Sequence, residues 1–198
     1  MELKDFLRYG HMDYETSWLL HECIIDHVGT IYENDARGVG TALDLIGNLL
    51  DEEKIDLDIL RFRIWACPGG GASASLAVFD SLRSWRERYA VNIQTEVYGS
   101  ASSAGAMVLL QAGDIRLAGK HSVFLLHEIS QYSDESESYS DITDKKTGMD
   151  MATKIVYTIL AERCGKSYQE VFDFIDRREN WMTYDNALDW GLIDGPII

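Results

Sequence analysis

Residues 91–113 read VNIQTEVYGSASSAGAMVLLQAG, and this stretch decides the fold. Between positions 91 and 98, apolar or β-branched residues alternate with polar ones, which predicts a strand with one buried face that ends at Gly99. Small residues fill positions 99–105, and the apolar run at 106–110 predicts a buried helix. The stretch therefore predicts a strand, a tight turn and a helix.

Such a turn can present a serine at a helix N-terminus, where unpaired N–H groups and the helix dipole favour negative charge on a nearby oxygen. We select Ser103, because Gly105 follows two residues later and small neighbours let a substrate backbone approach. The match to a G-x-S-x-G elbow is incomplete, since Ala101 occupies the first glycine position. A turn that only packs a helix on a sheet stays open as the alternative.

Length and charge limit the function classes. A chain of 198 residues suits one domain with a sizeable core. The formal net charge of -15 argues against a nucleic-acid partner, because such binding depends on clustered Lys and Arg. We see no signal peptide and no span long enough for a bilayer, so we expect a cytoplasmic protein without a membrane partner. The cysteines lack metal or disulfide spacing and are expected to be buried thiols: Cys23, Cys67 and Cys164.

Strands and helices alternate along the chain, which predicts parallel βα units in a single domain. Besides 91–98, strands are expected at 23–28, 61–67, 115–118 and 122–126. Helices are expected at 35–50 (capped by Asp35), at 72–89, from Gly148 to Gly165, from about Ser167, and before Gly191. Residues 129–147 lack apolar periodicity, so an exposed excursion is expected there.

Acyl transfer by a serine needs a base, a group that orients it, and donors for the oxyanion. His127 follows a buried strand and is expected at the sheet edge where Ser103 turns, although other histidines show that such a residue need not be catalytic. The CPGGG turn at 67–71 can aim backbone N–H groups at an oxyanion. Spacing does not choose the orienting acid among Asp173, Asp176, Glu179, Asp185 and Asp189.

Four blocks, in this order, resemble the proteolytic subunit of Clp proteases, a family of serine peptidases. They are CPGGGASASLAVFDSLR at 67–83, YGSASSAGAMVLLQAG at 98–113, SVFLLHE at 122–128 and WMTYDNALDWGLID at 181–194. The resemblance implies an α/β fold of the ClpP and crotonase type, with repeated β-β-α units in a spiral and a protruding strand-helix handle. It implies one peptidase domain over 1–198, with a short N-terminal segment at 1–15 and the handle region at 128–164.

The resemblance also assigns roles to residues. Ser103 corresponds to the nucleophile and His127 to the general base, and the backbone N–H groups of Gly70 and Ala104 correspond to the oxyanion hole. The neighbouring Ser102 replaces an alanine of the family pattern, which makes the choice of serine worth testing.

The third member of the triad is where this sequence departs from the family. The resemblance implies an aspartate two residues before the aromatic residue of the last block, and counting back from Trp181 reaches Glu179. A glutamate is one methylene longer, so Asp176 is kept as the alternative. Cys67 is another departure, since it replaces the family's serine before the proline, and so is Ala104, which replaces the methionine after the nucleophile.

The implied function is that of an ATP-dependent-Clp-type serine endopeptidase without a cofactor, acting on peptides or unfolded proteins in the chamber of a ring-shaped homo-oligomer. A heptamer or double heptamer is expected. An AAA+ ATPase partner stays open, because the segment that engages it in the family is short here. The alternatives are a catalytically weak structural ring subunit, suggested by Glu179, and a crotonase-fold acyl-CoA hydratase or isomerase. A divergent phage-type member would fit the departures.

Overall fold

The computed structural model describes residues 22–130, 139–176 and 178–198. The expected N-terminal segment at 1–15 therefore lies outside the described residues. The strands are β1 (Glu22–Val28), β2 (Ile59–Cys67), β3 (Asn92–Ser102), β4 (Ile115–Ala118), β5 (Val123–His127), β6 (Glu179–Met182) and β7 (Gly195–Pro196). The α-helices are α2 (Glu33–Asp51), α3 (Ala72–Tyr89), α4 (Tyr139–Cys164), α5 (Tyr168–Ile175) and α6 (Tyr184–Trp190). A π-helix, η1 (Gly105–Leu109), and a 3-10 turn, η2 (Leu110–Ala112), follow β3.

The strands form one mixed, mostly parallel sheet. Its main order is β1-β2-β3-β4-β7, and all of these pairs are parallel. Strand β5 also pairs with β3 in parallel, whereas β6 pairs with β5 in antiparallel orientation. The predicted parallel βα units are confirmed. Strand β6 was not predicted, because its four residues are too few to display a hydrophobic period.

Strand β3 pairs with two different strands along one of its edges. Residues Gln94–Val97 pair with β4, and residues Ser100–Ser102 pair with β5. Gly99 lies between the two pairings with a φ of +83°, a conformation that glycine adopts without a steric cost. The prediction that the strand ends at Gly99 is wrong, because this glycine marks a change of partner inside the strand.

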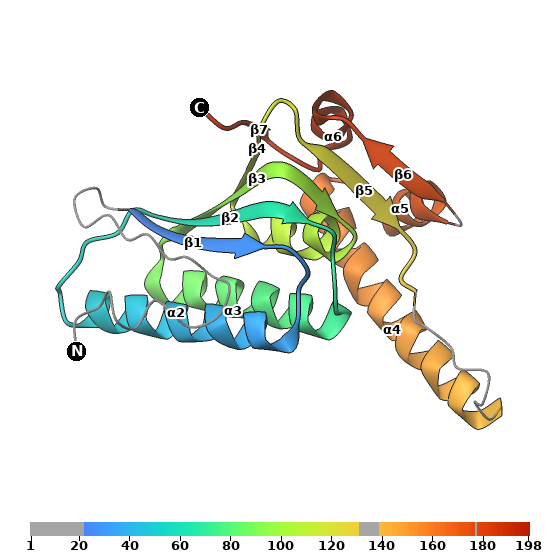
Figure 1. The fold of residues 1–198 in the computed structure, drawn as a ribbon, viewed down its shortest axis with the longest axis horizontal. Helices are drawn as coiled ribbons and strands as arrows, with labels where there is room; N and C mark the ends of the chain where they lie inside the picture. The colour runs from blue at the N-terminus through green and yellow to red at the C-terminus, as the bar shows by residue number, and fades with distance from the viewer. Residues whose placement is uncertain (1–21, 131–138, 177) are drawn as a thin grey trace.

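Helices α2 and α3 lie side by side and cover one face of β1, β2 and β3 (Figure 1). Trp85 of α3 donates from Nε1 to the carbonyl of Leu43 in α2, at 2.9 Å, inside the core. Both predicted helices are confirmed, although α2 begins two residues before Asp35. The Asp35 carboxylate accepts from the N–H of Tyr32 at 2.7 Å, so this residue caps the helix from within its first turn.

The opposite face of the central strand is also covered, which corrects the expectation of a single buried face. Gln94 and Glu96 are buried there, and Gln94 Nε2 donates to Glu96 Oε1 at 2.5 Å. The Tyr98 hydroxyl donates to Glu96 Oε2 at 2.9 Å, and Arg61 lies 3.4 Å from Glu96 Oε1. Gln94 and Glu96 are therefore buried in a hydrogen-bonded layer rather than exposed to water, while Asn92 at the start of the strand is exposed.

Helix α4 is longer than predicted and projects from the body of the molecule (Figure 1). It begins at Tyr139, so residues 139–147 are helical, which was not predicted, whereas the expected exposure is confirmed for 140–144 and 146–147. Residues 131–138 lie outside the described residues. The polar start is supported within the helix by the Lys146–Asp150 ion pair at 2.7 Å. Met151 and Ile155 lie one turn apart and are 63% and 48% exposed, so the described part of the chain leaves this apolar face uncovered.

The described residues contain no helix long and apolar enough to cross a membrane, and no group of side chains spaced to hold a metal ion. The three cysteines are free and buried, as predicted. Burial raises the pKa of the Cys67 and Cys164 thiols to about 11, so both are uncharged near neutral pH.

Asp114 joins α3 to the start of β3. Its carboxylate accepts from Arg83 Nη1 at 2.9 Å, from Arg86 Nε at 3.2 Å and from the N–H of Ile93 at 3.0 Å. Burial opposes ionisation of this carboxyl, but the hydrogen bonds from Ile93 and the arginines outweigh burial, so the pKa of Asp114 lies below its usual value.

A group with a lowered pKa stabilises the folded state above its unfolded pKa, and this stabilisation is lost as the pH falls through the folded pKa. We therefore predict that Asp114→Asn lowers the free energy of unfolding by about 1–3 kcal/mol at pH 7. The difference from wild type should shrink below pH 4. Urea unfolding at pH 7 and pH 3 measures it, with Asp80→Asn, an exposed change on α3, as the matched control. An equal difference at both pH values would refute the ionic role.

Candidate active site

Ser103 lies in a strained turn at the end of β3. Its φ is +52°, a left-handed conformation that costs a residue with a side chain about 1–2 kcal/mol. The surroundings fix it: the Ser103 N–H donates to the carbonyl of Leu125 at 2.8 Å, and its carbonyl accepts from the N–H groups of Ala106 and Met107 at 3.1 and 2.8 Å. A strained backbone conformation that several hydrogen bonds hold in place is typical of turns at functional sites.

Ser102 and Ser103 have different surroundings. Ser102 is buried within β3, where it pairs with Leu125 of β5, whereas Ser103 is half-buried at the end of the strand. Of the two neighbouring serines, Ser103 has the more accessible side chain.

The glycine turn after β2 packs directly against Ser103. A β-carbon on Gly69 would lie 2.6 Å from Ser103 Cβ and 3.2 Å from its Oγ, so a side chain here would displace the serine. Gly69 has a φ of +107° and Gly70 one of +151°, which also favour glycine. The sequence pointed to the CPGGG turn as a whole, but it did not show that Gly69 is the glycine in contact with the serine.

Gly70 is held by the segment that follows β1. The Ile31 N–H donates to the carbonyl of Gly69 at 2.9 Å, and the Gly71 N–H donates to the carbonyl of Ile31 at 3.0 Å. Because these groups flank Gly70 in a parallel bridge, its own N–H points away from Ile31, toward the side on which β3 lies. A β-carbon on Gly70 would lie 2.3 Å from the carbonyl oxygen of Ile31.

Ala104 follows the serine at the N-terminus of η1. The first N–H groups of a helix have no acceptor within it, and the helix dipole makes this end favourable for negative charge. The N–H groups of Gly70 and Ala104 thus belong to the two segments that flank Ser103. Together they could bind an oxyanion that forms on a substrate attacked by this serine.

His127 ends β5, the strand that carries the carbonyl bound by the Ser103 N–H. It is half-buried, and Glu179 of β6 stands directly opposite it in the antiparallel register. Side chains of such a pair share one face of the sheet, with their β-carbons about 5 Å apart. The structure therefore brings the predicted base and the predicted third residue together.

Among the described residues, no hydrogen bond joins the side chains of Ser103, His127 and Glu179. Catalytic hydrogen bonds commonly shorten only when substrate is bound. Asp176 lies at the end of α5, three residues before β6, and is less exposed than Glu179. Glu179 is therefore the residue paired with His127, and Asp176 lies three residues before it along the chain.

His27 and His121, the other described histidines, differ from His127 in their surroundings. His27 is buried, its Nε2 lies 3.0 Å from the carbonyl oxygen of Gly29, and burial lowers its pKa. His121 is exposed in the turn before β5. The predicted base His127 is the one of these three at the strand end beside the serine turn.

Cys67 fills the space beneath the turn and is fully buried. A β-carbon on Gly105 would lie 2.8 Å from Cys67 Sγ, so the thiol packs against the start of η1. A buried, uncharged thiol is a poor nucleophile. Cys67 is therefore a packing residue of the site.

A surface pocket of about 660 Å³ lies beside β6. It is lined by Glu179, Trp181 and Trp190, among others, but by neither Ser103 nor His127. The pocket is next to the candidate site rather than part of the Ser103 turn.

Comparison with known proteins adds family information to this geometry. The model of the Clp protease family matches residues 9–197. The ATP-dependent Clp protease proteolytic subunit 1 of Mycolicibacterium paratuberculosis is 30% identical over 156 residues, which is 78% of this chain and 71% of that protein. Proteolytic subunit 2 of Mycobacterium tuberculosis is also 30% identical over 156 residues, covering 78% and 70%. The match extends over most of the chain and agrees with the fold, and this chain belongs to the Clp protease family.

Proposed function

We propose that this chain is a serine endopeptidase of the Clp type, in which Ser103 is the nucleophile and His127 the general base. The observation that carries the proposal is the arrangement at one sheet edge. A serine on a strained turn touches a glycine loop and bonds to the strand whose last residue is His127, and that histidine pairs with an acidic residue.

In the proposed reaction, His127 takes the hydroxyl proton of Ser103 as Oγ bonds to the carbonyl carbon of a peptide. The N–H groups of Gly70 and Ala104 stabilise the negative charge on the carbonyl oxygen. His127 then gives the proton to the leaving amine as the C–N bond breaks. A water molecule, deprotonated by His127, releases the acyl group and restores Ser103. Each step uses groups of this chain and water.

We assign the third position to Glu179, because it faces His127 across the β5–β6 pair. A carboxylate there would hold the imidazole in the tautomer that accepts a proton from serine and stabilise the imidazolium that forms. The longer side chain of glutamate suits a partner on the neighbouring strand, whereas Asp176 would have to reach from the end of α5.

We further propose that the chain is a single peptidase domain that assembles into a ring-shaped homo-oligomer, with region 128–164 as the handle between rings. The exposed apolar face of α4 supports this, since Met151 and Ile155 would be covered by a second copy. Peptides and unfolded proteins are the proposed substrates. The alternatives, a structural ring subunit and an acyl-CoA hydratase or isomerase, gain no specific support from the site.

The first prediction from the proposed function concerns the nucleophile. Ser103→Ala should lower kcat/KM for a fluorogenic peptide at least about 1,000-fold, since it removes the attacking oxygen. It should also abolish the mass adduct formed with a fluorophosphonate. Ser102→Ala is the matched control and should stay within about threefold of wild type. An adduct that persists in Ser103→Ala and disappears in Ser102→Ala would move the nucleophile to Ser102.

The second prediction compares the two acids. Glu179→Gln keeps the shape of the side chain but removes its charge, and should lower kcat at least about 100-fold with little change in KM. Asp176→Asn should stay within about threefold. Steady-state peptide hydrolysis measures both. If Asp176→Asn causes the larger loss, Asp176 is the orienting residue, and if neither variant loses activity, the triad proposal lacks its third member.

The third prediction concerns assembly. Native mass spectrometry should detect a heptamer or a pair of heptamers. The double substitution Met151→Glu/Ile155→Glu should separate paired rings, because it buries charge at the proposed contact. Lys154→Glu, which adds an acid on the same exposed segment without removing apolar surface, is the control. A monomeric wild-type protein would refute the ring.

A further inference from the structure

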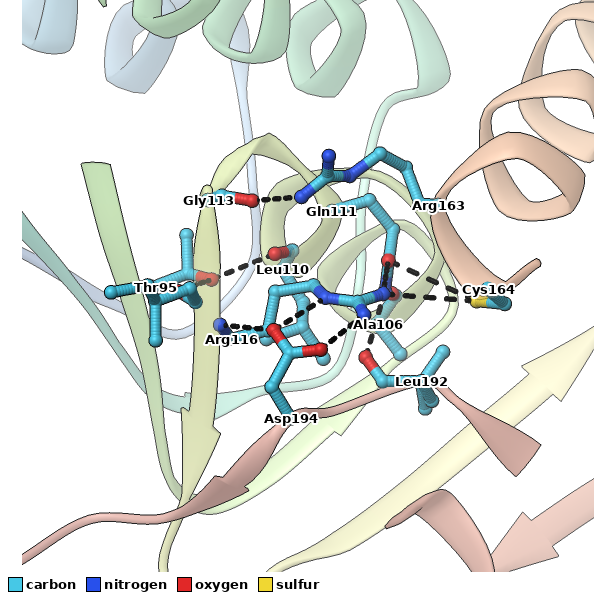
Figure 2. A network of polar contacts seen from close by, with 11 residues as sticks. Thr95, Ala106, Leu110, Gln111, Gly113, Arg116, Arg163, Cys164, Leu192 and Asp194 are labelled. Carbon is cyan, nitrogen blue, oxygen red and sulfur yellow. Dashed lines mark hydrogen bonds and ion pairs between the residues drawn. The ribbon is translucent and has the colours of Figure 1, made fainter. Parts of the chain in front are cut away.

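A chain of polar contacts runs inward from the exposed Asp194 of the C-terminal segment to the helix that follows Ser103 (Figure 2). Its outer end is Asp194, which holds Arg116 of β4. Asp194 Oδ2 accepts from the Arg116 N–H at 2.8 Å and from Nε at 3.1 Å, and Oδ1 accepts from Nη2 at 2.5 Å. Arg116 is 6% exposed, and a guanidinium this deeply buried requires such a partner.

Gln111 forms the inner end of the chain. Arg116 Nη1 donates to Gln111 Oε1 at 2.9 Å, and Gln111 Nε2 donates to the carbonyl of Ala106 at 3.0 Å. Because a guanidinium can only donate, it fixes the orientation of the amide, so Nε2 must face Ala106. Gln111 is fully buried. We call Asp194, Arg116, Gln111 and Ala106 the Gln111 network.

The Gln111 network reaches the serine turn through one residue. The Ala106 carbonyl accepts from Gln111, and the Ala106 N–H donates to the carbonyl of Ser103 at 3.1 Å. The helix that contains Ala106 is a π-helix, a form that is rare and often found at functional sites. The strained φ of Ser103 persists only if its neighbours hold it, and Ala106 is one of these neighbours.

We propose that Gln111 is a positioning residue for the reaction at Ser103. Gln111 holds Ala106 in place, and Ala106 in turn holds the orientation of Ser103. The Ala104 N–H, which lies between Ser103 and Ala106 in the chain, is oriented with them. Arg116 and Asp194 keep Gln111 in position. The inference rests on the proposed function, because its effect on rate requires Ser103 to react. It goes beyond that function in tying the reactivity of the serine to a salt bridge with the C-terminal segment.

Two substitutions of Gln111 distinguish its hydrogen bond to Arg116 from its hydrogen bond to Ala106. Gln111→Glu keeps an acceptor for Arg116 but cannot donate to the Ala106 carbonyl as a carboxylate. Gln111→Met is similar in length and removes the hydrogen bonds to Arg116 and Ala106, together with the longer contacts of the amide to the Leu192 carbonyl at 3.4 Å and to Cys164 Sγ at 4.0 Å. Thr95→Val is the matched control, because Thr95 Oγ1 donates to the carbonyl of Leu110, the first residue of η2, at 2.7 Å, with a longer contact to the carbonyl of Ile115 at 3.4 Å. It removes a buried hydrogen bond without touching Ala106.

The test is fluorophosphonate labelling of the native oligomer over a range of reagent concentrations, with urea unfolding on the same samples. We expect both Gln111 variants to lower the maximal labelling rate about tenfold or more, with the half-saturating concentration nearly unchanged. Thr95→Val should label within about twofold of wild type even where its urea midpoint falls. Gln111 variants that label at the wild-type rate would overturn the inference.

Hydrogen exchange of the Ala106 and Met107 amides, which donate to Ser103, gives a second readout that needs no reaction. Both amides should exchange faster in folded Gln111→Met but not in Thr95→Val, and unchanged exchange in Gln111→Met would overturn the inference.

The two readouts also separate this inference from the proposed function. If the folded wild type does not label, but exchange still speeds up in Gln111→Met and not in Thr95→Val, the proposed function is refuted and the positioning role is kept. If neither Gln111 variant folds, Asp194→Asn is measured in their place. It should lower the labelling rate and speed exchange of the two amides, each by less than is expected for the Gln111 variants. No change from wild type would overturn the inference.

Discussion

The left-handed turn at Ser103 is the constraint on which the rest of the site depends. A residue with a side chain adopts this conformation only when its neighbours leave no alternative, and here they come from three parts of the chain. Gly69 leaves room for the serine, Leu125 accepts its N–H, and Ala106 and Met107 donate to its carbonyl. The same contacts bring the glycine loop, the helix N-terminus and the strand of His127 to one edge of the sheet.

Strand β3 makes this convergence possible by changing partner at Gly99. Its first half pairs with β4 and its last residues pair with β5, so β5 extends beyond the main sheet and carries His127 to the end of β3. The antiparallel β6 then brings Glu179 opposite His127. Cys67 and Glu179 both have a defined place in this arrangement, since Cys67 packs against Gly105 and Glu179 is the residue paired with His127.

Hydrophobic periodicity and turn residues predicted the helices and strands whose ends are set by nearby residues. Helix α3 has the predicted bounds, because glycines precede it and Ala90 ends it in a left-handed conformation. The turn pattern selected Ser103, the strand pattern selected His127, and the resemblance added Glu179; the roles of all three remain predictions. Spacing could not reveal the pairing of His127 with Glu179, nor the link from Asp194 to Arg116, because both join residues far apart in sequence. The polar start of α4 was missed because it has no apolar stripe that would display the helical period, and an exposed i,i+4 pair such as Lys146–Asp150 is a weak signal in a sequence.

The most direct test of this account is a crystal structure of the oligomer after reaction with a peptide boronic acid, which forms a tetrahedral adduct with an activated serine. We predict a covalent bond from boron to Ser103 Oγ, one boronate oxygen within hydrogen-bonding distance of the Gly70 and Ala104 N–H groups, and the His127 ring in contact with the adduct. An adduct on Ser102, or one on Ser103 whose oxygens bind neither N–H group, would contradict the account.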